Sequence, residues 1–378
     1  MRDFCGTVLL EKKFFITEEQ VVTPAEILMG AFTDADKIYI NGICCGSSYD
    51  RYASRIYPVA PGILRAGENV VCIHLYVFRG RGGAMPGKQY GIRFKKGKER
   101  WLDLSGTWDA QIRKQMEYLP EKTFFNYMAS AMFNGMISPV SPYKICAVIY
   151  YQGESDVGHP NRYALEFRAL VNDWRKSWKE KQLPIIYVQL AGFSDGNIKK
   201  QGTQWAEFRE VQRQAMEIEN TAMVQAYDVG EYNDLHPMDK KALGMRAALA
   251  VHKLVYGEKE ECTGPQVRKI RLDRDKRVYA VFDQPLQTGS KKDGCELVSE
   301  VELRKANGDY KRAYVTVDGN EICAWLSDGE EPTGIRYAWK DCPMNICLYG
   351  KRGLPVIPFI KEWGRDAIYT GKICETDR

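Results

Sequence analysis

The sequence predicts an α/β protein with a parallel-sheet domain in the middle of the chain and a β-rich region on either side of it. Between about residues 134 and 255, strand-like apolar runs alternate with helix-like segments. Up to about residue 113 the pattern is one of strands and turns, and strands return after about residue 265. Strands separated by helices form parallel sheets, whereas strands joined by turns form antiparallel ones. With 378 residues the chain is long enough for three domains, which we expect at 1–113, 114–260 and 261–378.

The first domain is expected to be a β-sandwich. The run KIYINGICCGSS at 37–48 alternates around Asn41-Gly42, which is the strongest short signal for a β-hairpin. The run NVVCIHLYVF at 69–78 predicts a continuous buried strand, and the glycine-rich RGRGGAMPG follows it as a turn. Closely spaced strands with turn signals between them are typical of an antiparallel sandwich.

The middle domain is expected to contain three parallel strands, ICAVIYY (145–151), PIIYVQLA (184–191) and TAMVQAYDV (221–229). The helix-like segments between and after them are 162–178, 204–219 and 239–255. The first helix places apolar residues on one face, namely Tyr163, Phe167, Leu170, Trp174 and Trp178. Polar loops follow the first strand (QGESD, 152–156) and the third (DVGEYNDLHP, 228–237). Because parallel strands end at one edge of a sheet, both loops are expected at that edge.

The last domain is expected to be a small β domain. Its strand-like runs are RKIRLD, RVYAVF, CELVSEVELRK, RAYVTVDGNEICAWL and GIRYAW. Asp318-Gly319-Asn320 within the fourth run is a tight-turn signal.

Composition excludes several classes of function. The net charge of +5 is spread along the chain without aromatic residues among the basic clusters, so no nucleic-acid partner is expected. The eleven cysteines include no CxxC pair and no metal-like spacing, which favours buried reduced thiols and predicts neither a metal nor a cofactor. No apolar stretch approaches the roughly 18 residues of a membrane span, and residues 1–14 are too polar for a signal peptide.

Histidine is scarce enough for elimination. Of the four histidines, His74 falls in a strand, His252 in a helix and His159 in a turn. His236 stands in the loop NDLHP with Asp234 two residues before it, and a carboxylate beside an imidazole can orient it as a general base. His236 and Asp234 are therefore the predicted catalytic pair, with another carboxylate such as Asp228 as the alternative partner of the imidazole.

A serine nucleophile is harder to find. Ser155 follows a strand within GESDVG, but a nucleophile elbow reads G-x-S-x-G, and Gly158 falls one residue too late. An α/β-hydrolase-like enzyme that uses Ser155 remains a weak alternative.

Several motifs together resemble the sialate O-acetylesterase family, whose members are SGNH-type hydrolases. They are YYQGESD, the preceding FNGMISPVSPYKI, the following NDWRKSW and LPIIYVQLA, and the late NDLHP. The resemblance extends to DADKIYINGICCGSS, RYASRIYPVAPGILRAGENVV and GGAMPGKQYG in the first domain and to GIRYAW and GLPVIPF in the last. It implies a three-layer, flavodoxin-like catalytic domain with an inserted sugar-binding-type jelly roll and a closing β domain.

The resemblance also implies an activity and its site. In such esterases the loop that corresponds to Gln152, Gly153 and Glu154 lines the oxyanion side of the site, although Gln152 could instead only structure the loop. The family carries its serine in a G-Q-S-N motif, which the 378 residues lack. Its D-x-x-H spacing would place Asn233, not Asp234, in the acidic position.

Two hypotheses of different classes follow. The first is a carbohydrate O-acetylesterase whose nucleophile-bearing segment is absent from this chain, acting on an O-acetylated carbohydrate such as a sialic acid or a plant-type glycan. The second is a non-catalytic carbohydrate-binding protein derived from such an esterase. The resemblance suggests a secreted or periplasmic setting, and an oligomer is possible. If the nucleophile strand is absent, the apolar residues of ICAVIYY should face an unfilled groove or a partner chain, because an unpaired strand edge invites pairing.

Overall fold

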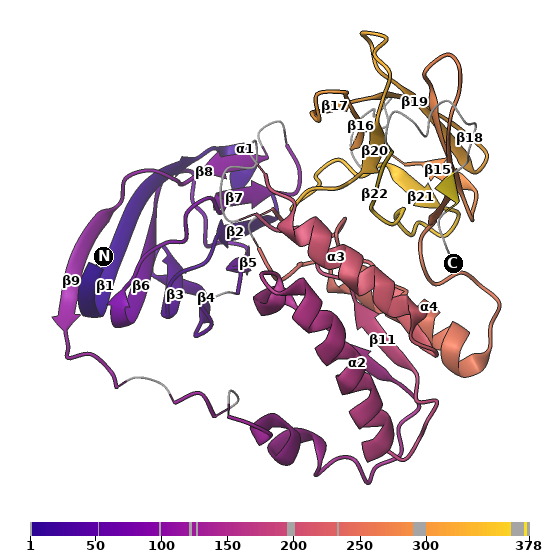
Figure 1. Ribbon diagram of the computed structural model, residues 1–378. Helices are drawn as coiled ribbons and strands as arrows, with labels where there is room; N and C mark the ends of the chain where they lie inside the picture. The colour runs from indigo at the N-terminus through magenta and orange to yellow at the C-terminus, as the bar shows by residue number, and fades with distance from the viewer. Residues whose placement is uncertain are drawn as a thin grey trace. The chain divides into compact units, whose positions relative to one another are not determined.

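The structure is a computed structural model. It describes residues 2–51, 53–97, 100–120, 123–125, 128–194, 201–232, 234–289, 300–363 and 374–375. The chain forms two compact units, Met1–Phe125 and Asn126–Arg378 (Figure 1). The α/β segment and the terminal β segment thus belong to one unit, and their separation into two domains at residue 260 stays a prediction.

The first unit consists of two antiparallel sheets that enclose one core. The five-stranded sheet has the order β4-β3-β6-β1-β9, with β1 (Arg2–Ile16), β3 (Ala35–Ile40), β4 (Ile43–Ser48), β6 (Gly67–Arg81) and β9 (Asp109–Gln115). The four-stranded sheet has the order β5-β2-β7-β8, with β2 (Ala25–Met29), β5 (Ile56–Val59), β7 (Tyr90–Phe94) and β8 (Trp101–Asp103). A single-turn helix, α1 (Glu18–Val21), begins at a capping box on Thr17.

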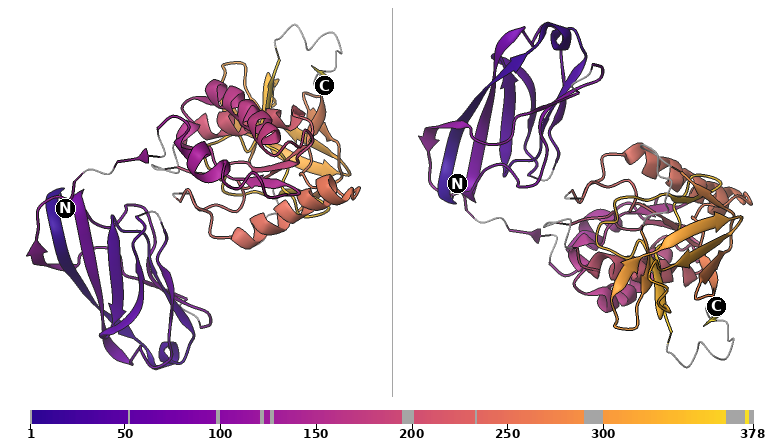
Figure 2. Two further views of the ribbon diagram at one scale, coloured as in Figure 1. Left: turned by 90° about the horizontal axis from the view of Figure 1, so that it is seen from below. Right: turned by 90° about the horizontal axis from the view of Figure 1, so that it is seen from above.

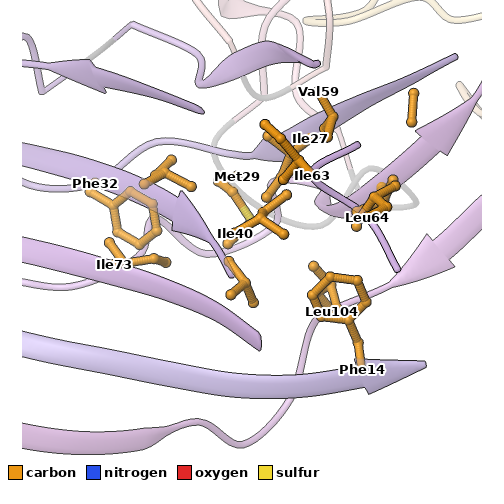
Figure 3. Close-up of a cluster of buried hydrophobic side chains, with 14 of the residues drawn as sticks. Phe14, Ile27, Met29, Phe32, Ile40, Val59, Ile63, Leu64, Ile73 and Leu104 are labelled. Carbon is orange, nitrogen blue, oxygen red and sulfur yellow. The ribbon is translucent and has the colours of Figure 1, made fainter. Parts of the chain in front are cut away.

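Side chains from both sheets fill the space between them (Figure 3). Ile27 and Met29 on β2 meet Ile40 on β3 and Ile73 on β6, and all are at most 1% exposed. The predicted hairpin at Asn41-Gly42 is confirmed, since both residues have positive φ between β3 and β4. The prediction of a continuously buried strand at 69–78 was wrong in one respect. Only alternate residues of β6 are buried, because an antiparallel sheet of a sandwich turns one face to the core.

One ion pair is fully buried in this unit. The Arg55 guanidinium lies 2.6 Å from the Asp36 carboxylate, and neither side chain is exposed. Burial raises the pKa of Asp36, which shows that desolvation outweighs the lowering effect of Arg55.

The second unit begins with a three-stranded parallel sheet of order β10-β11-β12. The strands are β10 (Val148–Tyr150), β11 (Ile185–Val188) and β12 (Thr221–Val224), and the helices are α2 (Pro160–Ser177), α3 (Gln204–Gln214) and α4 (Lys240–Tyr256). A π-helix (Phe133–Ile137) precedes the sheet, and 3₁₀ helices span Glu154–Asp156 and Ala215–Glu217.

The central strand β11 is covered on both faces, which gives three layers. Ile185 and Tyr187 pack with Phe167 of α2 and Phe208 of α3, whereas Ile186 and Val188 pack with α4. Figure 2 shows α4 on the opposite side of this unit from α2. The predicted apolar face of α2 is confirmed, since its residues are either buried or pack against the first of these clusters.

The rest of the second unit is antiparallel. A five-stranded sheet has the order β18-β19-β14-β13-β23, a four-stranded sheet β17-β16-β20-β22, and β15 pairs with β21. The strands are β13 (Val267–Leu272), β14 (Val278–Phe282), β15 (Leu286–Thr288), β16 (Val301–Arg304), β17 (Tyr310–Arg312), β18 (Tyr314–Asp318), β19 (Glu321–Trp325), β20 (Gly334–Tyr337), β21 (Leu348–Gly350), β22 (Phe359–Glu362) and β23 (Cys374–Glu375). Of the predicted strand CELVSEVELRK, residues 295–299 lie outside the described residues. Tyr227, from the loop after β12, is part of this core, so the terminal β segment is packed onto the parallel sheet.

The buried pair in the first unit yields a prediction about stability. Arg55→Met should lower the free energy of unfolding of the sandwich by about 3–5 kcal/mol, because it leaves the Asp36 charge buried and uncompensated. Urea unfolding followed by circular dichroism measures this. Arg93→Met is the matched control, because the Arg93–Glu26 pair lies at the surface with the Arg93 side chain 51% exposed. Equal losses for the two variants would contradict the prediction.

Candidate active site

The two polar loops singled out in the sequence leave the same edge of the parallel sheet. Gln152, Gly153 and Glu154 follow β10, whereas Asp234 and His236 lie in the loop after β12. Both strands run parallel to β11, which lies between them, so the predicted common edge is confirmed. Neighbouring strands are about 4.8 Å apart, which puts the ends of β10 and β12 about 10 Å from each other.

His236 is held by the carboxylate of Asp234. The backbone N–H of His236 donates to Asp234 Oδ1 over 2.9 Å, and Nδ1 of the imidazole lies 3.7 Å from the same oxygen. Asp234 is almost completely buried, whereas the His236 side chain is 56% exposed. The ring is therefore open to a substrate and rests beside a fixed carboxylate. At 3.7 Å the ring nitrogen is beyond hydrogen-bond distance of the carboxylate, and catalytic hydrogen bonds are often long before substrate binds.

Asp228, the alternative partner of the imidazole, is engaged elsewhere. Both of its oxygens accept hydrogen bonds from Arg246, at 2.6 and 2.7 Å, and Arg246 also donates to the carbonyl of Gln225. Burial acts to lower the pKa of Arg246, but the Asp228 pair outweighs it and the pKa is raised. Of these two carboxylates, Asp234 is the one beside the ring. Asn233 lies outside the described residues.

Gly153 fits its position for two independent reasons. Its φ of +148° is one that residues with a side chain rarely adopt. A Cβ at this position would lie 2.8 Å from the ring of Phe208 on α3. Among the residues that the structure describes, none accepts a hydrogen bond from the Gly153 N–H. Gly153 is itself buried, so this N–H is an unpaired donor inside the loop.

The amide of Gln152 is used within its own loop. Its oxygen accepts a 2.7 Å hydrogen bond from Tyr150, and its nitrogen donates to Asp156 over 2.9 Å. Arg162 of α2 holds the other oxygen of Asp156. The Gln152 amide retains one N–H hydrogen, so its contacts agree with a loop-structuring role and leave limited donor capacity. Glu154 is partly buried and makes no hydrogen bond or ion pair with the described residues.

The Ser155 hydroxyl is hydrogen-bonded to no base among the described residues. It is exposed on the short 3₁₀ helix Glu154–Asp156 and makes no hydrogen bond there. The nearest histidine along the chain, His159, is exposed at the N-terminus of α2. Without a hydrogen-bonded base to take its proton, the Ser155 hydroxyl is not activated as a nucleophile.

The structure adds a buried polar layer that the sequence analysis missed, made of Gln189, Arg209 and Gln212. Gln189, directly after β11, donates to the carbonyl of Arg209, and Gln212 accepts the N–H of Leu190. The Arg209 guanidinium donates to the carbonyls of Lys340 and Asp341. Burial lowers the pKa of Arg209 to about 10. The available signal was the presence of polar residues inside otherwise apolar periodic segments.

The edge of the sheet at β10 is open. β10 pairs only with β11 among the described strands, and Ile149 on it is 59% exposed. A groove of about 550 Å³ runs between β10 and α4, lined mainly by apolar side chains that include Ile149, Tyr151, Leu243 and Ala247. Of the run ICAVIYY, Ile149 and Tyr151 thus face this groove, whereas Val148 and Tyr150 pack against the cluster on the other face of the sheet. The segment before β10 also exposes large apolar side chains, namely Met128, Met132, Phe133, Met136, Val140 and Tyr143.

Two further features were searched for in the described part of the chain. No group of three or more His, Cys, Asp and Glu side chains there is arranged to hold a metal ion. None of the helices described is both long and apolar enough to cross a bilayer.

Comparison with known proteins gives consistent matches. Residues 110–253 match the family described as carbohydrate esterase, sialic acid-specific acetylesterase. The sialate O-acetylesterase of Mus musculus is 31% identical over 275 residues, and that of Homo sapiens is 28% identical over 264. These alignments cover 62% and 61% of this chain but only 47% and 48% of the two relatives. The chain thus spans about half the length of the curated relatives it matches.

A solved structure is similar as well. The carbohydrate acetylesterase XAC1771 from Xanthomonas citri is 29% identical, with a TM-score of 0.56. The match covers 61% of this chain and 54% of the other.

The geometry of Gly153 predicts the effect of adding a methyl group there. Gly153→Ala should destabilise the second unit by about 1–3 kcal/mol from backbone strain alone, and contact with Phe208 should add to this. Thermal unfolding measures the loss. Gly158→Ala is the control in the same loop, since its φ is not in the positive range and a Cβ there would meet nothing within 4 Å. A control variant as unstable as Gly153→Ala would show that the loop tolerates no change at all and would refute this explanation.

Proposed function

We propose that this chain, whose residues 110–253 match the family described as carbohydrate esterase, sialic acid-specific acetylesterase, hydrolyses acetyl esters on carbohydrates together with a serine-bearing segment outside the 378 residues. His236 is the general base and Asp234 orients it. The Gly153 N–H and the remaining amide hydrogen of Gln152 are the donors toward the oxyanion. Glu154 lines the same loop.

The observation that carries this proposal is the convergence of two loops at one edge of the parallel sheet. An exposed imidazole beside a buried carboxylate lies on one side. The buried Gly153, whose N–H has no partner among the described residues, lies on the other. Acyl transfer requires that one carbonyl group reach both a base and oxyanion donors. A separation of about 10 Å between the strand ends leaves room for a serine hydroxyl and an acetyl group between the two.

The open edge of β10 supports the second part of the proposal. An unpaired strand edge exposes N–H and C=O groups that pair readily with another strand. The apolar groove between β10 and α4 offers burial to the side chains of such a strand. A strand that pairs with β10 in parallel would bring its following residue to the same edge as Gly153 and His236. This is where a nucleophilic serine is needed. The sheet would then be the larger flavodoxin-like sheet of an SGNH hydrolase.

The reaction follows from these positions. The serine Oγ attacks the carbonyl carbon of the acetyl ester while His236 takes the hydroxyl proton. The resulting oxyanion accepts hydrogen bonds from Gly153 and Gln152, each typically worth about 3–4 kcal/mol in such sites. His236 then gives the proton to the sugar oxygen, which leaves as an alcohol. Water, deprotonated by His236, attacks the acetyl-serine and releases acetate. Asp234 stabilises the imidazolium that forms in each half of the reaction.

The proposal predicts activity by complementation. The purified 378-residue chain alone should hydrolyse 4-nitrophenyl acetate and an O-acetylated sugar only slightly above background. Loss of the serine from a triad typically costs about a million-fold in rate. Addition of a polypeptide that carries the G-Q-S-N motif, in trans or fused to the chain, should restore turnover. A serine-to-alanine version of that polypeptide is the matched control, because it can dock without supplying a nucleophile.

Variants of the complemented chain separate the roles of the residues. His236→Ala should abolish the restored turnover, whereas Asp234→Asn should reduce it by about 10⁴-fold while the imidazole stays in place. Ser155→Ala should leave it unchanged. Turnover by the uncomplemented chain that Ser155→Ala abolishes would make Ser155 the nucleophile. A chain that binds acetylated sugar but gains no activity from any serine-bearing segment would support a carbohydrate-binding function instead.

A further inference from the structure

The loop after β11, between the two proposed catalytic loops, presents an aromatic side chain. Ala191 and Gly192 are buried, whereas Phe193 is half-buried. The N–H of Ser194 donates to the carbonyl of Tyr232, four residues before His236, over 2.5 Å. Gly230 packs directly against Ala191 and Gly192. Phe193 is therefore fixed beside the loop that carries His236.

Trp205, in the first turn of α3, extends this aromatic surface. The Trp205 and Phe193 ring centroids are 5.2 Å apart, and the ring planes are tilted by 52°. Trp205 packs against the buried cluster that contains Phe208, yet the Trp205 side chain remains partly exposed. The two rings form a firm, half-buried surface of the kind on which the apolar C–H face of a pyranose ring can pack.

Asp341 provides a carboxylate next to these rings. One of its oxygens accepts the backbone N–H of Trp205 over 2.9 Å, and its carbonyl accepts the N–H of Phe193 over 3.2 Å. Its own N–H donates to the carbonyl of Gly202, and the Arg209 guanidinium donates a hydrogen bond to the carbonyl of Asp341. The residue comes from the terminal β segment, far along the chain from α3. These four hydrogen bonds, three to its backbone and one to its side chain, fix Asp341 in place, and the residue remains partly exposed.

We propose that Phe193, Trp205 and Asp341 form a subsite that binds an uncharged pyranose ring of the substrate. The inference rests on the proposed function and names its substrate class. The aromatic pair packs against the C–H face of the ring, and the free oxygen of Asp341 accepts a sugar hydroxyl in a charge-assisted hydrogen bond. An anionic sugar is disfavoured, because its carboxylate would approach the negative charge of Asp341.

Direct binding tests this without turnover. Isothermal titration of the 378-residue chain would compare a methyl O-acetyl-xyloside and a methyl O-acetyl-glucoside with the methyl glycoside of an O-acetylated sialic acid. The neutral glycosides are expected to bind at least about tenfold more tightly. A sialoside that binds as tightly as the neutral sugars, or more tightly, would overturn the assignment of substrate class.

Variants test the residues themselves. Trp205→Ala should weaken binding of the neutral glycosides about tenfold, and Trp205→Phe, which keeps an aromatic ring, should weaken it less. Trp101→Phe, an exposed tryptophan on β8 of the sandwich, is the matched control and should change nothing. Circular dichroism and thermal unfolding establish that each variant is folded. Unchanged affinity in folded Trp205→Ala would refute the subsite.

Asp341→Asn isolates the charge. The amide oxygen can still accept the Trp205 N–H, but the negative charge is gone. Affinity for the sialoside should rise about tenfold, whereas affinity for the neutral glycosides should change by less than about threefold. If both affinities fall together, Asp341 has only a structural role and the proposed charge discrimination is wrong.

The two proposals fail in different ways. Absence of hydrolysis after complementation, with Trp205-dependent sugar binding intact, would contradict the esterase function and leave the subsite. Hydrolysis that prefers the O-acetylated sialoside, or that is insensitive to Trp205→Ala, would contradict the subsite and leave the esterase function.

Discussion

The arrangement of the second unit depends on one buried cation. Arg209 is enclosed on α3 without a carboxylate in contact with its guanidinium, and it donates instead to two backbone carbonyls of the terminal β segment. Its own carbonyl accepts a hydrogen bond from Gln189 at the end of β11. A desolvated guanidinium is costly to bury, which is why its pKa falls to about 10. The two terminal nitrogens donate to these carbonyls, whereas the buried Nε has no partner among the described residues. The hydrogen bonds of Arg209 and Gln189 thus link α3, the end of β11 and the segment at 340–341.

This constraint explains why residues distant in the sequence meet at the sheet edge. The loop after β12 is attached to the terminal β segment through Tyr227, whose hydroxyl donates to the carbonyl of Val356, and through Gln225, which donates to the carbonyl of Pro355. The QGES loop is supported from α3 by Phe208, whose ring occupies the space that a side chain at position 153 would fill. Each proposed catalytic loop thus packs against a different element: the loop after β12 against the terminal β segment, and the QGES loop against α3.

The edge strand β10 of the same sheet has fewer neighbours among the described residues than the central strand β11. β11 is buried on both faces and paired on both edges, whereas β10 has one free edge and an apolar groove beside it. The exposed apolar residues of the segment before β10 add to this surface. Isolated exposed apolar residues are normal, but an open strand edge with an apolar groove beside it is typical of an interaction surface. In the proposed enzyme, a serine-bearing strand that pairs with β10 would both cover this edge and supply the nucleophile.

The sequence by itself determined the layout of the fold. Hydrophobic periodicity identified α2 and the three parallel strands, and Asn41-Gly42 identified its hairpin, because these features depend on local backbone preferences and on which face of an element is apolar. The common edge of the two loops also followed from the sequence, since the carboxyl ends of parallel strands lie at one edge of a sheet. Only the tertiary structure decided how side chains are engaged. In the folded chain the Gln152 amide is hydrogen-bonded to Tyr150 and Asp156. Asp228 accepts hydrogen bonds from Arg246, and Asp341 accepts one from the N–H of Trp205. Hydrogen-bond partners of buried polar groups depend on distances between segments far apart in the chain, and such distances leave no periodic trace in the sequence.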